Sequence, residues 1–159
     1  MASFNQTPKF FLRLIHWPPQ LAYAIGAGSV IGNVILLLTT IGRNSGKKRV
    51  TPLQYEIIAG RLYLAASLGP KSDWVRNIMN NPQVEVHLKT RKFSGLAEAI
   101  TETKQIADFL ELRLERHPKM IGAVLRAEGL SVPPKRSELE QYATQLTLIA
   151  VTPGSDFVF

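Results

Sequence analysis

The chain has 159 residues, of which 45% are hydrophobic and 19% charged, and this composition is typical of one folded domain rather than a disordered chain. It contains no cysteine, which excludes disulfides, thiolate metal sites and a cysteine nucleophile and favours a cytoplasmic protein. The net charge of +7 is uneven, because residues 1–92 hold 12 Lys or Arg against three acids, whereas residues 93–159 hold seven against nine. This imbalance predicts that the N-terminal half binds an anionic partner.

Residues 1–33 are predicted to form an N-terminal helical segment that contains a short amphipathic helix over 8–16 and a Gly-rich connector. Residues 14–42 carry no charged side chain and are long enough to span a bilayer, but prolines and glycines interrupt them, so we do not expect a membrane span. Peripheral contact with a membrane surface stays open, through Phe10, Phe11, Leu14 and Trp17.

The hydrophobic pattern then predicts six strands, over residues 34–40, 50–58, 62–67, 84–88, 93–100 and 146–152. Helices are expected over 73–80 after an N-cap at Ser72, over 102–116, between Pro118 and Gly129, and after a capping box of Ser137 and Glu140. The whole chain, 1–159, is thus predicted to be one mainly β domain of the α+β class. Residues 34–100 would form the core of a small antiparallel barrel, residues 101–145 a helical insertion and residues 146–152 the closing strand.

A basic loop over residues 42–49 joins the first two predicted strands. Two glycines let the backbone turn tightly and expose its N–H groups, and four cations supply charge-assisted hydrogen bonds to a phosphate. The hydroxyls of Ser45 and Thr51 would add donors. Solvated hairpin turns rich in Lys and Arg are common, and such a turn explains the loop alone equally well. The sequence of the loop matches neither the P-loop nor the dinucleotide-binding pattern.

The wider segment resembles a known family. Residues 36–53 read LLLTTIGRNSGKKRVTPL, which is similar to the signature of the deazaflavin-dependent nitroreductases, and residues 64–67, 73–77 and 81–84 continue the likeness in order and spacing. The resemblance implies a split β-barrel, a six-stranded antiparallel Greek-key barrel with peripheral helices. It also implies an oxidoreductase, similar to nitroreductases or quinone reductases, that transfers hydride between reduced 8-hydroxy-5-deazaflavin (coenzyme F420) and an electrophilic organic acceptor.

By the same resemblance, the cofactor's anionic tail would be bound by the basic loop, the rest of the cofactor would lie along two strands, and one helix would form the remaining wall. The loop residues are Arg43, Asn44, Ser45 and Arg49, with Lys47 and Lys48 compensating for an asparagine where the family commonly has lysine. The strand residues are Val50, Thr51, Pro52, Leu53, Ala65, Ala66 and Ser67, and the helix residues are Asp73, Trp74, Arg76 and Asn77.

The sequence indicates no metal site and no catalytic acid or base. The three histidines, His16, His87 and His117, lack the spacing of metal ligands, and His87 is expected on an exposed strand face. Best-known family members use tyrosines near the substrate, but residues 117–129 contain none, so such tyrosine-assisted reduction is not expected here.

Two alternatives stay open at this point. One is a split-barrel oxidoreductase that binds FMN or FAD, and the other is a non-catalytic protein that binds a cofactor, haem or nucleic acid. Nucleic acid is the less expected partner, because no exposed aromatic series accompanies the basic residues. The apolar N-terminal segment and small barrel also suggest a homodimer.

Overall fold

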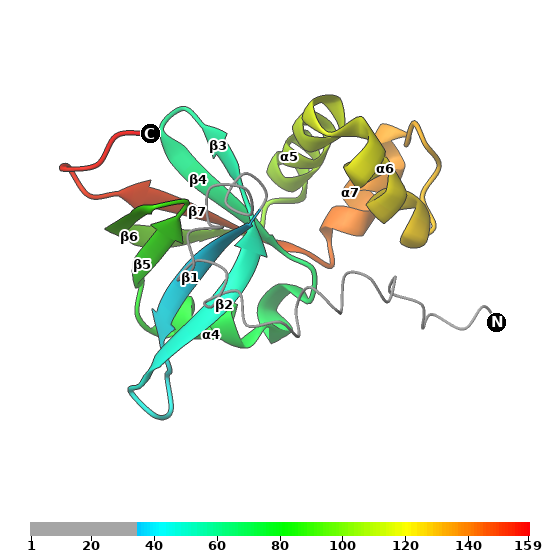
Figure 1. Ribbon diagram of the computed structural model, residues 1–159. Helices are drawn as coiled ribbons and strands as arrows, with labels where there is room; N and C mark the ends of the chain where they lie inside the picture. The colour runs from blue at the N-terminus through cyan, green and yellow to red at the C-terminus, as the bar shows by residue number, and fades with distance from the viewer. Residues whose placement is uncertain (1–34) are drawn as a thin grey trace.

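A computed structural model describes residues 35–159, in which a curled antiparallel sheet is accompanied by helices on its outside (Figure 1). The predicted helical segment over 1–33 and Val34, the first residue of the first predicted strand, lie outside the described residues. In the part of the chain that the structure describes, no helix is long and apolar enough to cross a membrane.

Seven strands form one sheet in the order β2-β1-β5-β6-β7-β4-β3. They are β1 (Ile35–Ile41), β2 (Lys48–Gln54), β3 (Glu56–Ile58), β4 (Arg61–Ala66), β5 (Gln83–Leu88), β6 (Arg91–Ile100) and β7 (Thr147–Pro153). Every pairing is antiparallel, as predicted.

The prediction of six strands was wrong, because the strand expected over 50–58 is two strands. It begins at Lys48, is interrupted at Tyr55 and changes partner there: β2 pairs with β1, whereas β3 pairs with β4. The two ends of the sheet are therefore separated by one residue in the chain. The sheet must curl until its ends approach each other, and this makes it an incompletely closed barrel.

The strands show two patterns of burial. In β1, Leu36, Leu37 and Leu38 are buried in succession, as expected for a strand covered on both faces. In β5, Val84 and Val86 are buried and Glu85 between them is exposed, which confirms a strand with one solvent-facing side. The strand predicted over 93–100 begins earlier, at Arg91, because Lys89 adopts a left-handed backbone with φ 57° and turns the chain directly after β5.

The final strand, predicted over 146–152, is confirmed as β7, but it lies inside the sheet, where it joins β6 to β4. Two apolar cores result, one inside the barrel and one between the sheet and the helices. Because successive side chains of β4 point to opposite faces, Leu64 belongs to the first core and Ala65 to the second.

The helices lie in two places: a short one crosses one end of the sheet, and three pack together on another side (Figure 1). They are the 3₁₀ turn η1 (Gly69–Lys71) with α4 (Asp73–Asn80), then α5 (Thr103–Arg116), α6 (Pro118–Ala127) and α7 (Arg136–Ala143). Ser72 is the N-cap residue of α4, although its side chain makes no capping bond.

The capping box predicted for the last helix was wrong. The N-cap of α7 is Lys135, whose N–H donates to Glu138 Oε2 over 2.7 Å. Ser131 Oγ donates to the same oxygen, so Glu138 also ties the preceding segment to the helix. Ser137 lies within the helix, and Glu140 instead pairs with Arg136 across one turn.

Candidate functional site

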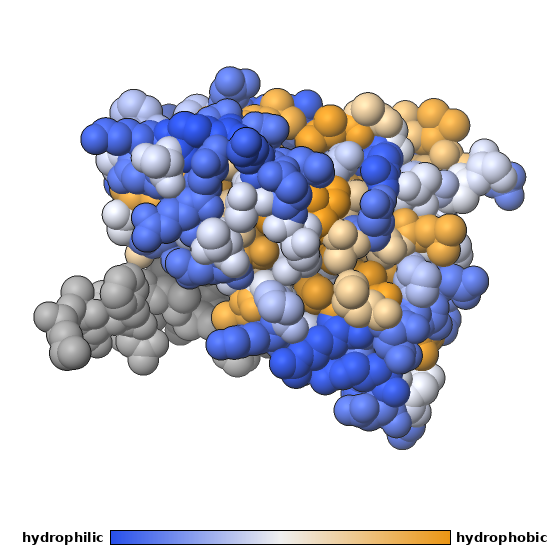
Figure 2. Space-filling model, turned by 180° about the vertical axis from the view of Figure 1, so that it is seen from behind, coloured by the Kyte–Doolittle hydropathy of each residue, from blue (hydrophilic) through white to orange (hydrophobic). Residues whose placement is uncertain are grey.

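The basic loop is a tight connection between β1 and β2. Gly42 N–H donates to Lys47 O and Gly46 N–H donates to Gly42 O, both over 2.8 Å. Gly46 has φ 65°, and a Cβ at Gly42 would lie 2.7 Å from Ser45 Oγ, so the turn needs both glycines. The loop projects from the end of the sheet near α4 (Figure 1). Seen from behind, hydrophilic residues gather at this lower end of the molecule (Figure 2).

One amide side chain fixes the loop to α4 and β1. Asn77 Oδ1 accepts from Arg43 N–H over 3.1 Å and from Arg43 Nη1 over 3.2 Å. Asn77 Nδ2 donates to Thr40 Oγ1 over 3.1 Å, and both of these residues are buried. Arg43 Nη2 also pairs with Asp73 Oδ1 over 3.0 Å. The Arg43 guanidinium is thus held in one orientation by α4, although 30 residues or more separate the partners in sequence.

The loop, β2 and α4 together enclose a hollow of about 410 Å³. Its walls contain eight of the predicted cofactor residues, together with Gly42: Arg43, Asn44, Ser45, Arg49, Thr51, Asp73, Trp74 and Asn77. Tertiary structure therefore brings together residues from three segments that the resemblance implied separately.

The donors in this hollow suit an anionic group. Among residues 35–159, the Arg49 side chain has no ion pair, and the backbone N–H groups of Asn44 and Ser45 have no hydrogen-bond partner. The charge of Arg43 is neutralised by Asp73. The lining therefore has a net charge of +1, which comes from Arg49. A phosphate or carboxylate placed here would meet a guanidinium and two amides, and the residues present fit the tail of the implied cofactor.

Two of the other predicted loop cations lie away from the hollow. Lys47 is exposed at the loop, and its N–H donates to Ser45 Oγ over 3.3 Å. Lys48 Nζ pairs with Glu85 Oε1 over 2.7 Å on the outer face of the sheet. Arg76 on α4 is directed elsewhere too, since its Nε donates to Pro70 O over 3.1 Å.

The predicted strand residues are divided between faces. On β2, Leu53 packs against the barrel core, and Val50 is 40% exposed. Because alternate residues share a face, Val50 and Pro52 lie on the face of β2 opposite Thr51. On β4, Ala66 is inside the barrel and Ala65 faces the helices, while Ser67 is exposed beyond the strand. The two alanine side chains thus cannot both face one flat ring.

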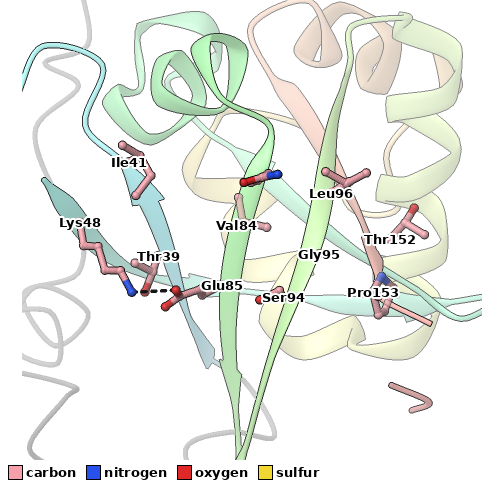
Figure 3. A pocket seen from close by; sticks show the side chains of 12 residues that line it. Thr39, Ile41, Lys48, Val84, Glu85, Ser94, Gly95, Leu96, Thr152 and Pro153 are labelled. Carbon is pink, nitrogen blue, oxygen red and sulfur yellow. Dashed lines mark hydrogen bonds and ion pairs between the residues drawn. The ribbon is translucent and has the colours of Figure 1, made fainter. Parts of the chain in front are cut away.

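A larger hollow of about 610 Å³ lies on the outer face of the sheet (Figure 3). Its charged lining residues are Lys48 and Glu85, and they neutralise each other through the ion pair drawn in Figure 3. It offers no net charge to an anionic ligand, so we do not assign the cofactor to it.

A third hollow, of about 330 Å³, lies where β2 turns into β3 beside the junction of α5 and α6. It is lined by Tyr55, Glu56, Arg113, His117, Pro118, Lys119 and Met120. Burial and the Glu56 charge raise the pKa of Tyr55, so the phenol stays protonated at neutral pH.

Three basic side chains surround the buried Glu56 carboxylate. Its Oε1 lies 2.7 Å from His117 Nε2 and 3.4 Å from Arg113 Nε, and its Oε2 lies 3.1 Å from Arg116 Nη1. Arg113 is buried, which lowers its pKa, and its Nη2 donates to Gln54 Oε1 over 2.9 Å. No sequence prediction included this cluster.

The positions of two basic residues at the end of α5 could have indicated the cluster around Glu56. The buried stripe predicted for α5 was Ile106, Phe109, Leu110 and Leu114. Arg113 lies three residues after Leu110 and His117 four residues later, so both continue that stripe, and polar residues on a buried stripe need a buried partner.

Replacing Asn77 with alanine is expected to lower the free energy of unfolding by about 1–3 kcal/mol, because Thr40 Oγ1 and the Arg43 N–H lose their buried partner. The loop would also lose its attachment to α4, so the hollow should bind an anion less tightly. Urea unfolding measures the first effect. Asn80→Ala on the exposed end of the same helix is the control, and an Asn77→Ala protein as stable as this control would contradict the role given to the amide.

Comparison with known proteins identifies the family. A model of the family described as F420H(2)-dependent quinone reductase matches residues 22–121, which is more than half of the chain. Three similar solved structures illustrate the fold. A conserved hypothetical protein from Mycobacterium tuberculosis has a TM-score of 0.57 and 19% identity, over 82% of this chain and 78% of that one. An F420-H2 dependent reductase has a TM-score of 0.50 and 26% identity, over 74% and 92%. A protein described as a domain-swapped dimer has a TM-score of 0.53 and 23% identity, over 91% and 99%.

These likenesses confirm the split-barrel fold, and the family match selects coenzyme F420 among the cofactors left open by the sequence. The chain belongs to the F420H(2)-dependent quinone reductase family and is accordingly a deazaflavin-dependent oxidoreductase whose cofactor is coenzyme F420.

Proposed function

We propose that the protein passes hydride from reduced coenzyme F420 to a quinone-like acceptor, and that the hollow beside the basic loop holds the cofactor's anionic tail. The observation that supports this placement is the set of donors at that hollow. Arg49 and the N–H groups of Asn44 and Ser45 have no partner among residues 35–159, while Arg43 is already oriented by Asn77 and Asp73.

The residues of the hollow would bind and orient the cofactor rather than react. Arg49 would form charge-assisted hydrogen bonds with the tail, and Thr51 would add a hydroxyl donor from the same face of β2. When bound, the cofactor supplies hydride from C5 of its deazaflavin ring. The protein would accelerate the reaction mainly by holding the cofactor and the acceptor in a reactive orientation.

The remaining predicted contacts stay predictions. They are Lys47, Lys48, Val50, Pro52, Leu53, Ala65, Ala66, Ser67 and Arg76, which lie outside the hollow. Nitroreductase-like acceptors are the other class of substrate for the same hydride transfer.

The function is tested with purified protein in two steps. We expect saturable binding of F420 in a fluorescence titration, with no comparable binding of FMN or FAD. Reduced F420 should then be oxidised in the presence of menadione only when the protein is added. Saturable binding of FMN or FAD without binding of F420 would contradict the proposed cofactor site. Binding of F420 without oxidation by menadione or by a nitroaromatic compound would contradict the proposed acceptor class.

We also propose that the protein is cytoplasmic and that it forms a homodimer. The dimer is supported by the similar structure described as a domain-swapped dimer. The peripheral membrane contact predicted for Phe10, Phe11, Leu14 and Trp17 falls outside the described residues and stays a prediction. Light scattering of the purified protein would distinguish a dimer from a monomer.

A further inference from the structure

Hydride transfer to a quinone also needs a proton, and the sequence indicated no residue to supply it. A two-electron reduction by hydride leaves negative charge on the acceptor oxygen, and a positioned acid stabilises that charge by protonation. The third hollow contains a candidate acid, because an imidazole lies there beside a buried carboxylate.

This hollow lies at the opposite end of β2 from the basic loop. Thr51 lines the hollow beside the basic loop, and Tyr55 lines the third hollow. The four-residue separation along an extended chain corresponds to about 13 Å. The hollow beside the basic loop and the third hollow thus lie at opposite ends of one strand, and we place the acceptor in the third hollow.

The geometry of His117 suits an acid. Its Nε2 is held 2.7 Å from the carboxylate of Glu56, which is 5% exposed, whereas its own side chain is 41% exposed. His117 is the N-cap residue of α6, but its side chain makes no capping hydrogen bond. In the protonated ring, Nε2–H would donate to Glu56 and Nδ1–H would remain as the second donor.

Charges of both signs surround this imidazole. On one side is the carboxylate of Glu56 on β3, and around it are the cations Arg113 and Arg116 on α5 and Lys119 on α6. The phenol of Tyr55, between β2 and β3, lines the same hollow in its protonated state.

We propose that His117 is the catalytic residue that protonates the acceptor, and that Glu56 is its positioning residue. This proposal rests on the proposed function. The acceptor takes two electrons as a hydride from the reduced cofactor, which is thereby oxidised. The Nδ1–H bond of the imidazolium then breaks as an O–H bond forms on the acceptor, and the neutral imidazole regains a proton from water at its exposed side.

A first experiment uses the cofactor-free protein and needs no turnover. In protein labelled with ¹³C-histidine, menadione should shift the imidazole signal of His117 and leave that of His87, on β5, in place. In a Glu56→Gln variant the menadione-dependent shift of the His117 signal should become smaller, because the carboxylate that holds the ring in place has been removed. Absence of a menadione-dependent shift at His117 would overturn the proposal.

A second experiment measures turnover of the F420-loaded enzyme with menadione. His117→Gln should lower kcat by about 100-fold or more and remove the pH dependence due to the imidazole, with F420 affinity unchanged. His87→Gln is the matched control and should behave as the wild type. Added imidazole should partly restore His117→Ala, which loss of a merely structural side chain would not permit.

The experiments distinguish an error in the role of His117 from an error in the proposed function. If the wild type does not oxidise reduced F420 with menadione, the proposed function is wrong. If the wild type does so and His117→Gln retains its rate and pH profile, only the role of His117 is wrong. Should Glu56→Gln fail to fold, the His117 variants still decide the question.

Discussion

Replacing Glu56 with alanine is expected to lower the free energy of unfolding by about 3–5 kcal/mol, the cost of removing one partner from a buried ion pair. Glu56 is 5% exposed and is the carboxylate that Arg113, Arg116 and His117 share. Without it, the buried Arg113 guanidinium would keep only the acceptor on Gln54, and the neighbouring cations would repel one another. Urea unfolding at neutral pH measures the change.

The matched control is Glu98→Ala. Glu98 also pairs with an arginine across 2.9 Å, but its side chain is 67% exposed, so the same substitution should cost about 1 kcal/mol or less. Equal effects at the two positions would show that the Glu56 cluster does not stabilise the junction of β3 with α5.

Replacing Arg49 with alanine is expected to weaken F420 binding by about 1–3 kcal/mol, which corresponds to about 5- to 150-fold in Kd. Arg49 lines the hollow beside the basic loop and has no ion pair among the described residues, so its whole charge is available to the cofactor's tail. Its side chain is exposed, so the fold should be unaffected. A fluorescence titration at two salt concentrations measures the affinity, and the wild type should lose more affinity with salt than the variant.

Lys48→Ala provides the comparison within the same loop. Lys48 precedes Arg49 in sequence, but it pairs with Glu85 on the outer face of the sheet and does not line the hollow. Its loss should change affinity by much less than the loss of Arg49. An Arg49→Ala protein with wild-type affinity, or a larger effect at Lys48, would show that the tail binds on the other face of β2.

Local patterns predicted most of the individual elements. Alternation of Val84, Glu85 and Val86 is a property of neighbouring residues, and it correctly indicated a strand with one buried face. Turn and cap residues placed α4 after Ser72 in the same way. The division of one expected strand at Tyr55 was missed, because a change of pairing partner leaves no mark on hydrophobic periodicity.

Local sequence patterns were also insufficient to predict the contacts within the site. The basic loop and the family resemblance named Arg43, and the resemblance alone named Asp73 and Asn77. Only the folded chain shows that one buried amide ties the loop to α4. The cluster around Glu56 was not predicted, since its partners on α5 and at the start of α6 lie 57 to 61 residues further along the chain. A charged residue inside a strand or helix gives no indication of which distant residue neutralises it.

By itself, the sequence determined the antiparallel β-rich domain, the basic loop between the first two strands and the family to which they point, because these depend on periodicity, turn chemistry and short motifs. Tertiary structure decided which loop cations line the hollow beside the basic loop and which pair elsewhere, as Arg49 and Lys48 show. It also decided that His117 lies against Glu56 beside a second hollow. The physical reason is that adjacent side chains on a strand point to opposite faces, and only the curl of the sheet determines what each face meets.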